Sequence, residues 1–273
     1  MPRIYVLLDD YSPLAAFESQ HGASYWIELE DVNVLLDTGP HAAPVLHNMR
    51  ELGLDPRDLD YIVLSHCHYD HTGGLLEILK AVSRRIPVIA HPSIFRCTLV
   101  LKPRLRYIGV PFTSRELEDL SHPVLTADPL EITDSVFTTG EVKRREDFER
   151  RGFEAYMVSN GHLVRDEMLD DVSLVVKAGE KTVIITGCAH AGIVSIVKHV
   201  MNLTGSTPRV LIGGFHLRSA PLERIRLTVS YLKRLGVEEV YAGHCTGLMA
   251  EAELSRVYGD GFRKLYSGMV IEL

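Results

Sequence analysis

Short apolar runs, separated by polar turns and by longer amphipathic stretches, alternate along the chain. Runs rich in β-branched residues are typical of packed strands, whereas apolar positions three or four residues apart indicate helices. The runs predict strands at 4–8, 24–30, 32–37, 61–65, 88–90, 172–176, 182–186, 210–214, 239–242 and 268–273. The amphipathic stretches predict helices at 42–52, 74–84, 191–202, 221–235 and 248–257.

Two of these stretches show why the pattern predicts layers. Residues 25–36 are two apolar runs that turn around Asp31, as expected for a hairpin in a sheet with one packed face. Residues 221–235 carry an apolar stripe near helical spacing, with Pro221 in the first turn and Gly236 just beyond the end. Because strands and helices alternate in both halves of the chain, we predict an α/β fold of sheets flanked by helices.

Residues 92–168 differ from their surroundings, because they are rich in charge and proline and their apolar runs are weak. Weak strands are predicted at 106–110, 124–126 and 132–138, and a helix at 114–120. We interpret 92–168 as an α+β subdomain inserted into a main domain made of 1–91 and 169–273. The charged cluster at 143–151 is interpreted as a solvated face, with a ligand site as the alternative.

Composition and charge exclude some classes of function. The chain has 273 residues, of which 46% are hydrophobic and 24% charged, and its formal net charge of −7 disfavours binding to nucleic acid. No apolar stretch approaches the roughly 20 residues that span a bilayer, and the first apolar run ends in Asp9 and Asp10. We therefore expect a cytoplasmic protein. None of the four cysteines forms a CxxC pair, so we expect buried thiols rather than a disulfide or a cysteine-only zinc site.

The candidate chemistry is concentrated at residues 65–74, Ser-His-Cys-His-Tyr-Asp-His-Thr-Gly-Gly. Three histidines and an aspartate follow directly after the predicted strand 61–65. A turn at the end of a strand can aim alternate side chains at one point, and imidazole and carboxylate groups are ligands for zinc and other divalent metals. The cluster therefore predicts a metal site rather than a set of surface histidines.

Three later histidines repeat one arrangement. His190, His216 and His244 each follow an apolar strand and a glycine or another small residue. A single histidine after a strand is usually structural. Three of them in a chain that already carries a metal cluster indicate a shared site, since sites of α/β sheets assemble at strand ends.

These motifs together resemble the metallo-β-lactamase superfamily. The resemblance rests on His66-x-His68-x-Asp70-His71, preceded by Asp37-Thr38-Gly39 and followed by His190 and His244. It implies a four-layer αββα sandwich with the site at one edge of the sheets. It also implies two sets of metal ligands, His66, His68 and His190 for one ion and Asp70, His71 and His244 for the other. Asp37 would orient the histidine loop from outside the ligand shell.

One departure from the family pattern concerns the carboxylate that bridges the two metals in many members. The corresponding strand here ends in Gly213-Gly214-Phe215-His216, which offers none. Two cations would then repel each other with less compensation, so one site is expected to bind weakly or to stay empty. His216 is interpreted as a substitute ligand, a substrate contact or a structural residue.

Four shorter runs narrow the resemblance. Residues 21–24, 187–193, 213–217 and 244–247 look like a subgroup labelled as dihydropterin-ribofuranosyl-aminobenzene-phosphate synthases or as metal-dependent hydrolases. The subgroup implies a ferredoxin-like insertion, which we assign to 92–168. It also places His21 near the site as a substrate contact, although a turn histidine is an equal alternative.

The predicted function is metal-dependent hydrolysis of an ester-type bond in a small molecule, such as a phosphodiester or a lactone. A bound cation lowers the pKa of water from about 15.7 toward about 7, and the resulting hydroxide attacks. Asp70 would orient it or take its proton, and His216 or His244 would stabilise charge on the leaving side. The ligand types favour zinc, with manganese or iron as alternatives, as one or two ions.

Two rival functions use the same residues. The first is a pterin-pathway synthase or other transferase acting on the same metal site. The second is a redox or binding protein, which is disfavoured because the chain lacks a bridging aspartate and because six ligands from several segments leave open metal positions. A homodimer, in which the charged insertion shapes the cleft of a second copy, is a further expectation.

Overall fold

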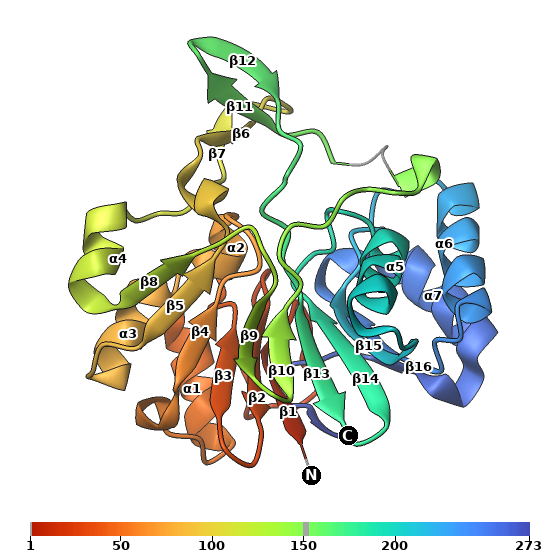
Figure 1. Ribbon diagram of the computed structural model, residues 1–273, viewed down its shortest axis with the longest axis horizontal. Coiled ribbons are helices and arrows are strands. Elements are labelled where there is room, and N and C mark those ends of the chain that lie inside the picture. Colours follow the sequence, from red (N-terminus) through yellow and green to blue (C-terminus); the bar gives the residue numbers. More distant parts are fainter. Residues whose placement is uncertain (1, 150–152) are drawn as a thin grey trace.

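Two seven-stranded sheets packed face to face form the body of the computed structural model, which describes residues 2–149 and 153–273 (Figure 1). The first sheet has the order β18-β1-β2-β3-β4-β5-β8 and the second the order β17-β16-β15-β14-β13-β10-β9. The strands of the first sheet are β1 (Arg3–Leu8), β2 (Ser24–Glu28), β3 (Asn33–Leu36), β4 (Tyr61–Val63), β5 (Pro87–Ala90), β8 (His122–Leu125) and β18 (Val270–Glu272). Those of the second are β9 (Leu130–Thr133), β10 (Val136–Thr138), β13 (Leu174–Ala178), β14 (Lys181–Thr186), β15 (Pro208–Gly214), β16 (Glu239–Gly243) and β17 (Phe262–Lys264).

Helices cover the outer face of each sheet (Figure 1). The first sheet is covered by α1 (Ala42–Glu51), α3 (Leu75–Val82) and α4 (Ser114–Leu120), and the second by α5 (Ile193–Thr204), α6 (Leu222–Arg234) and α7 (Leu248–Tyr258). The single turn α2 (Tyr69–Thr72) lies at the sheet edge, and short 3-10 turns occur at Pro56–Asp58, Pro92–Phe95, Asp147–Glu149, His244–Thr246 and Gly259–Gly261. The predicted αββα sandwich is confirmed. None of the helices in the described ranges is long and apolar enough to cross a bilayer.

The alternation of side chains along the strands separates three apolar cores. Val183 and Ile185 of β14 point between the two sheets, whereas Ile184 points toward the helices of the second sheet. Ile62 and Val63 of β4 divide in the same way between the first helical layer and the inner core. This period of two is why strands buried on both faces appear in the sequence as continuous apolar runs.

The parallel parts of both sheets bring their carboxyl ends to one edge. Strands β3, β4, β5 and β8 run parallel, and so do β14, β15, β16 and β17. Register places Thr186 opposite Gly213, and Gly214 opposite Gly243, so β14, β15 and β16 end nearly level. The loops that follow them therefore meet at a common edge, as predicted for the three later histidines.

The inserted segment differs from its prediction. Strand β8 joins the first sheet, β9 and β10 join the second, and α4 contacts α3 and β8, so residues 92–168 do not form one separate ferredoxin-like unit. Strands β9 and β10 bury one face against the inner core, which their weak apolar pattern concealed. The helix at 114–120 is confirmed and begins with a capping box formed by Thr113 and Glu116.

What remains separate is a small four-stranded sheet that projects above the sheet edge (Figure 1). Its order is β12-β11-β6-β7, with strands β6 (Thr98–Val100), β7 (Arg106–Tyr107), β11 (Tyr156–Ser159) and β12 (His162–Arg165). Val100, Ile108, Ala155 and Met168 form its buried core, with the partly buried Phe153 packed against them. This sheet, called here the roof sheet, supplies residues that line the site below.

Candidate functional site

Side chains that follow the carboxyl ends of six strands converge at the sheet edge. Asp10 follows β1, Asp37 follows β3, His66 to His71 follow β4, His190 follows β14, His216 follows β15, and His244 follows β16. The rings are enclosed, since His66 and His71 have no exposed surface and His244 is 3% exposed. The structure thus brings together all six predicted metal ligands.

Strained backbone marks several of these strand ends. Asp37, Ala189, His216 and His244 have φ angles of +62°, +52°, +49° and +46°. A left-handed conformation is unfavourable for residues with a Cβ, and it persists only where the surrounding structure enforces it. These residues turn the chain sharply at the end of each strand and so direct the neighbouring side chains inward.

The first donor set consists of His66, His68 and His190. The Nε2 atom of His66 lies 3.0 Å from Nδ1 of His68, and the ring centroid of His190 lies 4.8 Å from that of His66 and 4.9 Å from that of His68. Nε2 of His190 is buried and has no hydrogen-bond partner in the part of the chain that is described. A buried, unpartnered ring nitrogen facing two others fits a cation with imidazole ligands, whose nitrogens lie roughly 3.3 Å apart around tetrahedral zinc.

The second donor set consists of Asp70, His71 and His244. The Nε2 atoms of His71 and His244 lie 3.2 Å apart. Oδ2 of Asp70 lies 3.9 Å from the former and 3.7 Å from the latter. Two imidazoles and one carboxylate aimed at a common point also suit a divalent metal.

Carboxylates outside the two sets fix the orientation of the rings. Oδ2 of Asp37 accepts hydrogen bonds from Nδ1 of His71 at 2.7 Å and from the Ser65 hydroxyl at 2.7 Å, and that hydroxyl contacts Nδ1 of His66 at 2.9 Å. Oδ1 of Asp10 lies 2.7 Å from Nδ1 of His244. Each of these rings is thus left with Nε2 directed into the site, which is the usual arrangement behind metal-bound histidines.

The surroundings shift the pKa values of the histidines in the two sets in opposite directions. Burial lowers the pKa of His66 and His190 well below the ordinary range, and lowers the pKa of His68 to about 4. Burial opposes the shift at His244, but Cys245 and Asp10 raise its pKa to about 10. Burial likewise opposes the shift at His71, whose pKa is raised by Asp37. The first set therefore offers neutral imidazoles, the form that binds metals.

The loop that carries the first histidines is anchored by a buried charge network. Asp170 accepts a hydrogen bond from the Cys67 backbone N–H at 2.7 Å and pairs with Arg96 at 2.5 Å. Arg96 also pairs with Asp166 at 2.8 Å. Because Cys67 separates His66 from His68, this network fixes the backbone between two donors.

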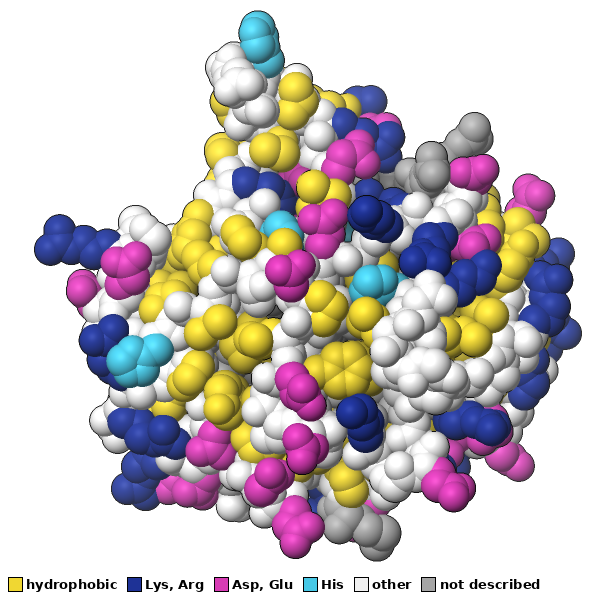
Figure 2. Space-filling model, viewed as in Figure 1, with side chains coloured by type: hydrophobic (Ala, Val, Ile, Leu, Met, Phe, Trp, Pro, Cys, Tyr) yellow, Lys and Arg dark blue, Asp and Glu magenta, His cyan; other side chains and the backbone are white. Residues whose placement is uncertain are grey.

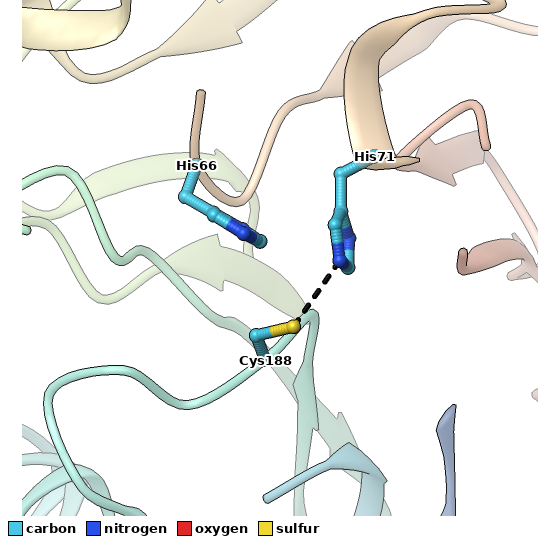
Figure 3. A group of neighbouring side chains, drawn as sticks. All are labelled: His66, His71 and Cys188. Atoms are coloured by element: carbon cyan, nitrogen blue, oxygen red, sulfur yellow. Dashed lines mark hydrogen bonds between the residues drawn. The ribbon is translucent and has the colours of Figure 1, made fainter. Parts of the chain in front are cut away.

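Cys188 is a residue of this site that the sequence interpretation missed. Its Sγ lies 3.2 Å from Nε2 of His71, and Figure 3 shows it pointing, with His66 and His71, toward a common point. The cysteine is buried, and burial raises the pKa of its thiol well above the usual range. Its place in a Gly-Cys-Ala-His run was visible in the sequence, but its nearest donor lies 117 residues away along the chain.

His21 and His216 both lie at the site. The ring of His21 is half exposed, with Nδ1 2.9 Å from Asp10 and Nε2 3.5 Å from Asp70. The ring centroid of His216 lies 4.3 Å from that of His190, and its Nδ1 is buried without a hydrogen-bond partner in the described ranges. Both positions allow contact with a ligand.

A cavity of about 240 Å³ opens onto the two sets. Its lining includes His21, Asp70, Arg106, Arg218 and Phe153, so the roof sheet and the segment leading into it close one side. A second cavity, of about 460 Å³, adjoins it at Phe153, His190 and His216. Lys143, Arg144 and Arg165 are among its lining residues, and Figure 2 shows basic side chains beside a histidine below the projecting roof sheet.

The charged cluster at 143–151 is not simply a solvated face. Arg144 donates hydrogen bonds to the His190 carbonyl, and the buried Glu149 accepts from the backbone N–H groups of Val194 and Ser195 at 2.9 Å each. Glu149 thereby satisfies the start of α5, the helix that follows His190. The end of the cluster, residues 150 and 151, lies outside the described residues.

Comparison with known proteins decides the family. The model of the metallo-beta-lactamase superfamily matches residues 20–244, a range that contains both donor sets. The chain belongs to this superfamily. Members use divalent metals, and the donor sets of this metallo-β-lactamase fold are suited to hold them.

Two relatives match this chain over nearly its whole length. One is a 7,8-dihydropterin-6-methyl-4-(beta-D-ribofuranosyl)-aminobenzene-5'-phosphate synthase of Methanocaldococcus jannaschii, 38% identical, with 99% of this chain and 96% of the relative covered. The other is a solved metal-dependent hydrolase of the beta-lactamase superfamily, 29% identical, with a TM-score of 0.87 and 100% and 99% of the two chains covered. Zinc-bound PqqB of Methylobacterium extorquens, 12% identical with a TM-score of 0.58 and 99% and 100% of the two chains covered, shares the fold.

Proposed function

We propose that this protein is a metal-dependent hydrolase that cleaves an ester-type bond, such as a phosphodiester or a lactone, in a small molecule. The observation that carries the proposal is the convergence of six donors beside a cavity of about 240 Å³. A divalent cation held there would lower the pKa of water and polarise the oxygen of the ester group. We assign zinc to the site, because its ligands are mostly imidazoles.

The chain's own residues have separate tasks in this proposal. Asp70 would orient the attacking water, because its Oδ2 lies within 4 Å of His21, His71 and His244 and so faces the centre of the site. His21 lies at the open side of the site, where its exposed ring can contact substrate. His216, beside His190, contacts the group that leaves toward the larger cavity.

The charge around the smaller cavity favours an anionic substrate. Arg106 and Arg218 line it beside Asp70, whereas the larger cavity is lined by Lys143, Arg144 and Arg165 and equally by Glu141, Asp166 and Glu167. Arginine pairs well with phosphate, because its guanidinium group donates two parallel hydrogen bonds. A phosphate-bearing small molecule is therefore the proposed substrate class.

Hydrolysis of bis(4-nitrophenyl) phosphate and of a lactone panel tests the proposal. Protein loaded with zinc or manganese should hydrolyse at least one of them, lose the activity on chelation, and regain it when metal returns. His190→Ala should be inactive, whereas His162→Ala, a change at an exposed histidine of β12, should match the unaltered protein. Activity that survives both chelation and His190→Ala would overturn the proposal.

A pterin-pathway synthase is the second candidate, and it is favoured by the 38% identity to the Methanocaldococcus enzyme over 99% of this chain. Mass spectrometry can detect the joined product after incubation with an activated 6-hydroxymethyl-dihydropterin and 4-(β-D-ribofuranosyl)aminobenzene 5'-phosphate. Metal-dependent joining without hydrolysis of any ester in the panel would establish the synthase in place of the hydrolase.

A further inference from the structure

The end of β15 has no room for a bridging side chain. A Cβ on Gly214 would lie 2.5 Å from the Gly187 carbonyl oxygen and 2.6 Å from Sγ of Cys245, and a Cβ on Gly213 would lie 2.1 Å from the Thr186 carbonyl oxygen. Neither position can carry a carboxylate while the backbone keeps this path. An anionic side chain shared by the two donor sets must therefore come from another position in the chain.

The neighbouring strand β14 supplies such a group. Gly187 follows β14, and a Cβ on it would lie 2.1 Å from the Ser65 hydroxyl and 2.8 Å from Oδ2 of Asp37. Glycine therefore lets the loop approach the histidine-bearing loop closely, and the next residue, Cys188, is delivered to the centre of the site.

Cys188 lies between the two donor sets and contacts the second. Its Sγ lies within 4.8 Å of a ring nitrogen of each of four histidines. Two of them, His66 and His190, belong to the first set, and the other two, His71 and His244, belong to the second. The 3.2 Å contact with Nε2 of His71 is near the roughly 3.6 Å that separates sulfur and nitrogen on one tetrahedral zinc ion.

The charge of the site also favours a thiolate at this position. Asp70 is the carboxylate of the two donor sets, while Asp37 and Asp10 are engaged with Nδ1 atoms on the outer side of the rings. One carboxylate leaves two dications poorly compensated. A thiol that binds a metal gives up its proton to solvent and adds one negative charge between the sets.

We propose that Cys188 is a metal ligand whose sulfur bridges the two donor sets in place of the missing aspartate, an inference that rests on the proposed metal-dependent function. His190 supports the assignment, because its Nε2 is buried and unpartnered in the described ranges and a nitrogen of its ring lies within 4.8 Å of Sγ of Cys188. The bridge would hold two ions that the histidines and Asp70 alone would hold less tightly.

Cobalt titration followed by absorption spectroscopy tests this assignment, since cobalt bound to a thiolate absorbs in the near ultraviolet. Chelator-treated protein is titrated with Co²⁺ without air, alongside Cys188→Ser, Cys188→Ala, Cys245→Ser and Cys97→Ser. Cys245 is the buried neighbour and Cys97 the exposed cysteine. We expect two equivalents and the sulfur band in the unaltered protein, in Cys245→Ser and in Cys97→Ser.

Both Cys188 variants should lose the band and bind the second equivalent more than about tenfold more weakly. Two bound cobalt ions without a sulfur band, or a band that disappears only in Cys245→Ser, would overturn the bridge while leaving the metal site intact. Failure of the unaltered protein to bind cobalt would overturn both the bridge and the proposed function. If the Cys188 variants do not fold, a sulfur band that persists in both Cys245→Ser and Cys97→Ser still supports Cys188, whereas its absence from the unaltered protein overturns the bridge.

Discussion

The two donor sets use the same kinds of side chain in opposite electrostatic surroundings. In the first set, His66 is backed by a serine hydroxyl, and burial lowers the pKa of both His66 and His190. In the second, His71 and His244 are backed by Asp37 and Asp10 and have raised pKa values. The comparison teaches that neighbouring groups, namely Asp37 beside His71 and Cys245 with Asp10 beside His244, distinguish the two positions rather than the histidines themselves.

Removing one ligand from each set should give the largest effects. We expect His190→Ala to lower the metal affinity of the first set, and His244→Ala that of the second, by at least about 100-fold. Loss of a ligand lowers metal affinity more than loss of a hydrogen-bond partner of a ligand does. Isothermal titration with zinc should show one remaining tight equivalent in each variant. His162→Ala is the control, and loss of both equivalents from either variant would mean that the sets are not separable.

Asp37→Asn should have the next largest effect. The amide cannot accept as a carboxylate does from both the His71 ring and the Ser65 hydroxyl, so the loop loses its orientation. We expect metal affinity or activity to fall about 10- to 100-fold. Asp119→Asn, a change at an exposed residue, is the matched control. An unchanged Asp37→Asn protein would show that the outer carboxylate is dispensable.

Asp10→Asn should change the pH dependence of stability of the chelator-treated protein. A raised pKa of His244 stabilises the fold fully below the unfolded value of about 6.5, and this contribution disappears as pH rises toward about 10. The melting temperature of the unaltered protein should therefore fall by several degrees between pH 7 and pH 10. The fall should be smaller in Asp10→Asn, and an equal fall in both proteins would refute the role given to Asp10.

Glu149→Gln should have the smallest effect and should act on stability rather than on chemistry. The amide retains one acceptor oxygen, while the carboxylate accepts from Val194 and from both the N–H and the hydroxyl of Ser195. We expect a loss of about 1–2 kcal/mol, or a melting temperature lower by about 2–8 °C. Zinc stoichiometry should stay the same, and a changed stoichiometry would give Glu149 a direct part in the metal site.

The strand pattern alone predicted α/β layers and a metal site at the strand ends, whereas the sandwich, the six donors and the role of Asp37 came from the resemblance to the superfamily; the structure has that sandwich and brings these residues together. The sequence did not reveal Asp10 and Cys188, because an aspartate after β1 and a cysteine beside His190 gain their roles only when the fold brings them to Nδ1 of His244 and Nε2 of His71. The carboxylate pair at 9–10 after β1 was a visible signal of the same kind as Asp37. The prediction that 92–168 form one inserted subdomain did not foresee that β8, β9 and β10 join the two main sheets. These strands lie at or next to the sheet edges and have little apolar pattern of their own.

The metal content of the natively purified protein, measured by elemental analysis together with its hydrolytic activity, tests the central claim most directly. We predict about two equivalents of a divalent metal, most of it zinc, and activity that is lost on chelation and restored by reloading. Protein that contains no metal, and that binds neither zinc, manganese nor iron when these are supplied, would contradict the account.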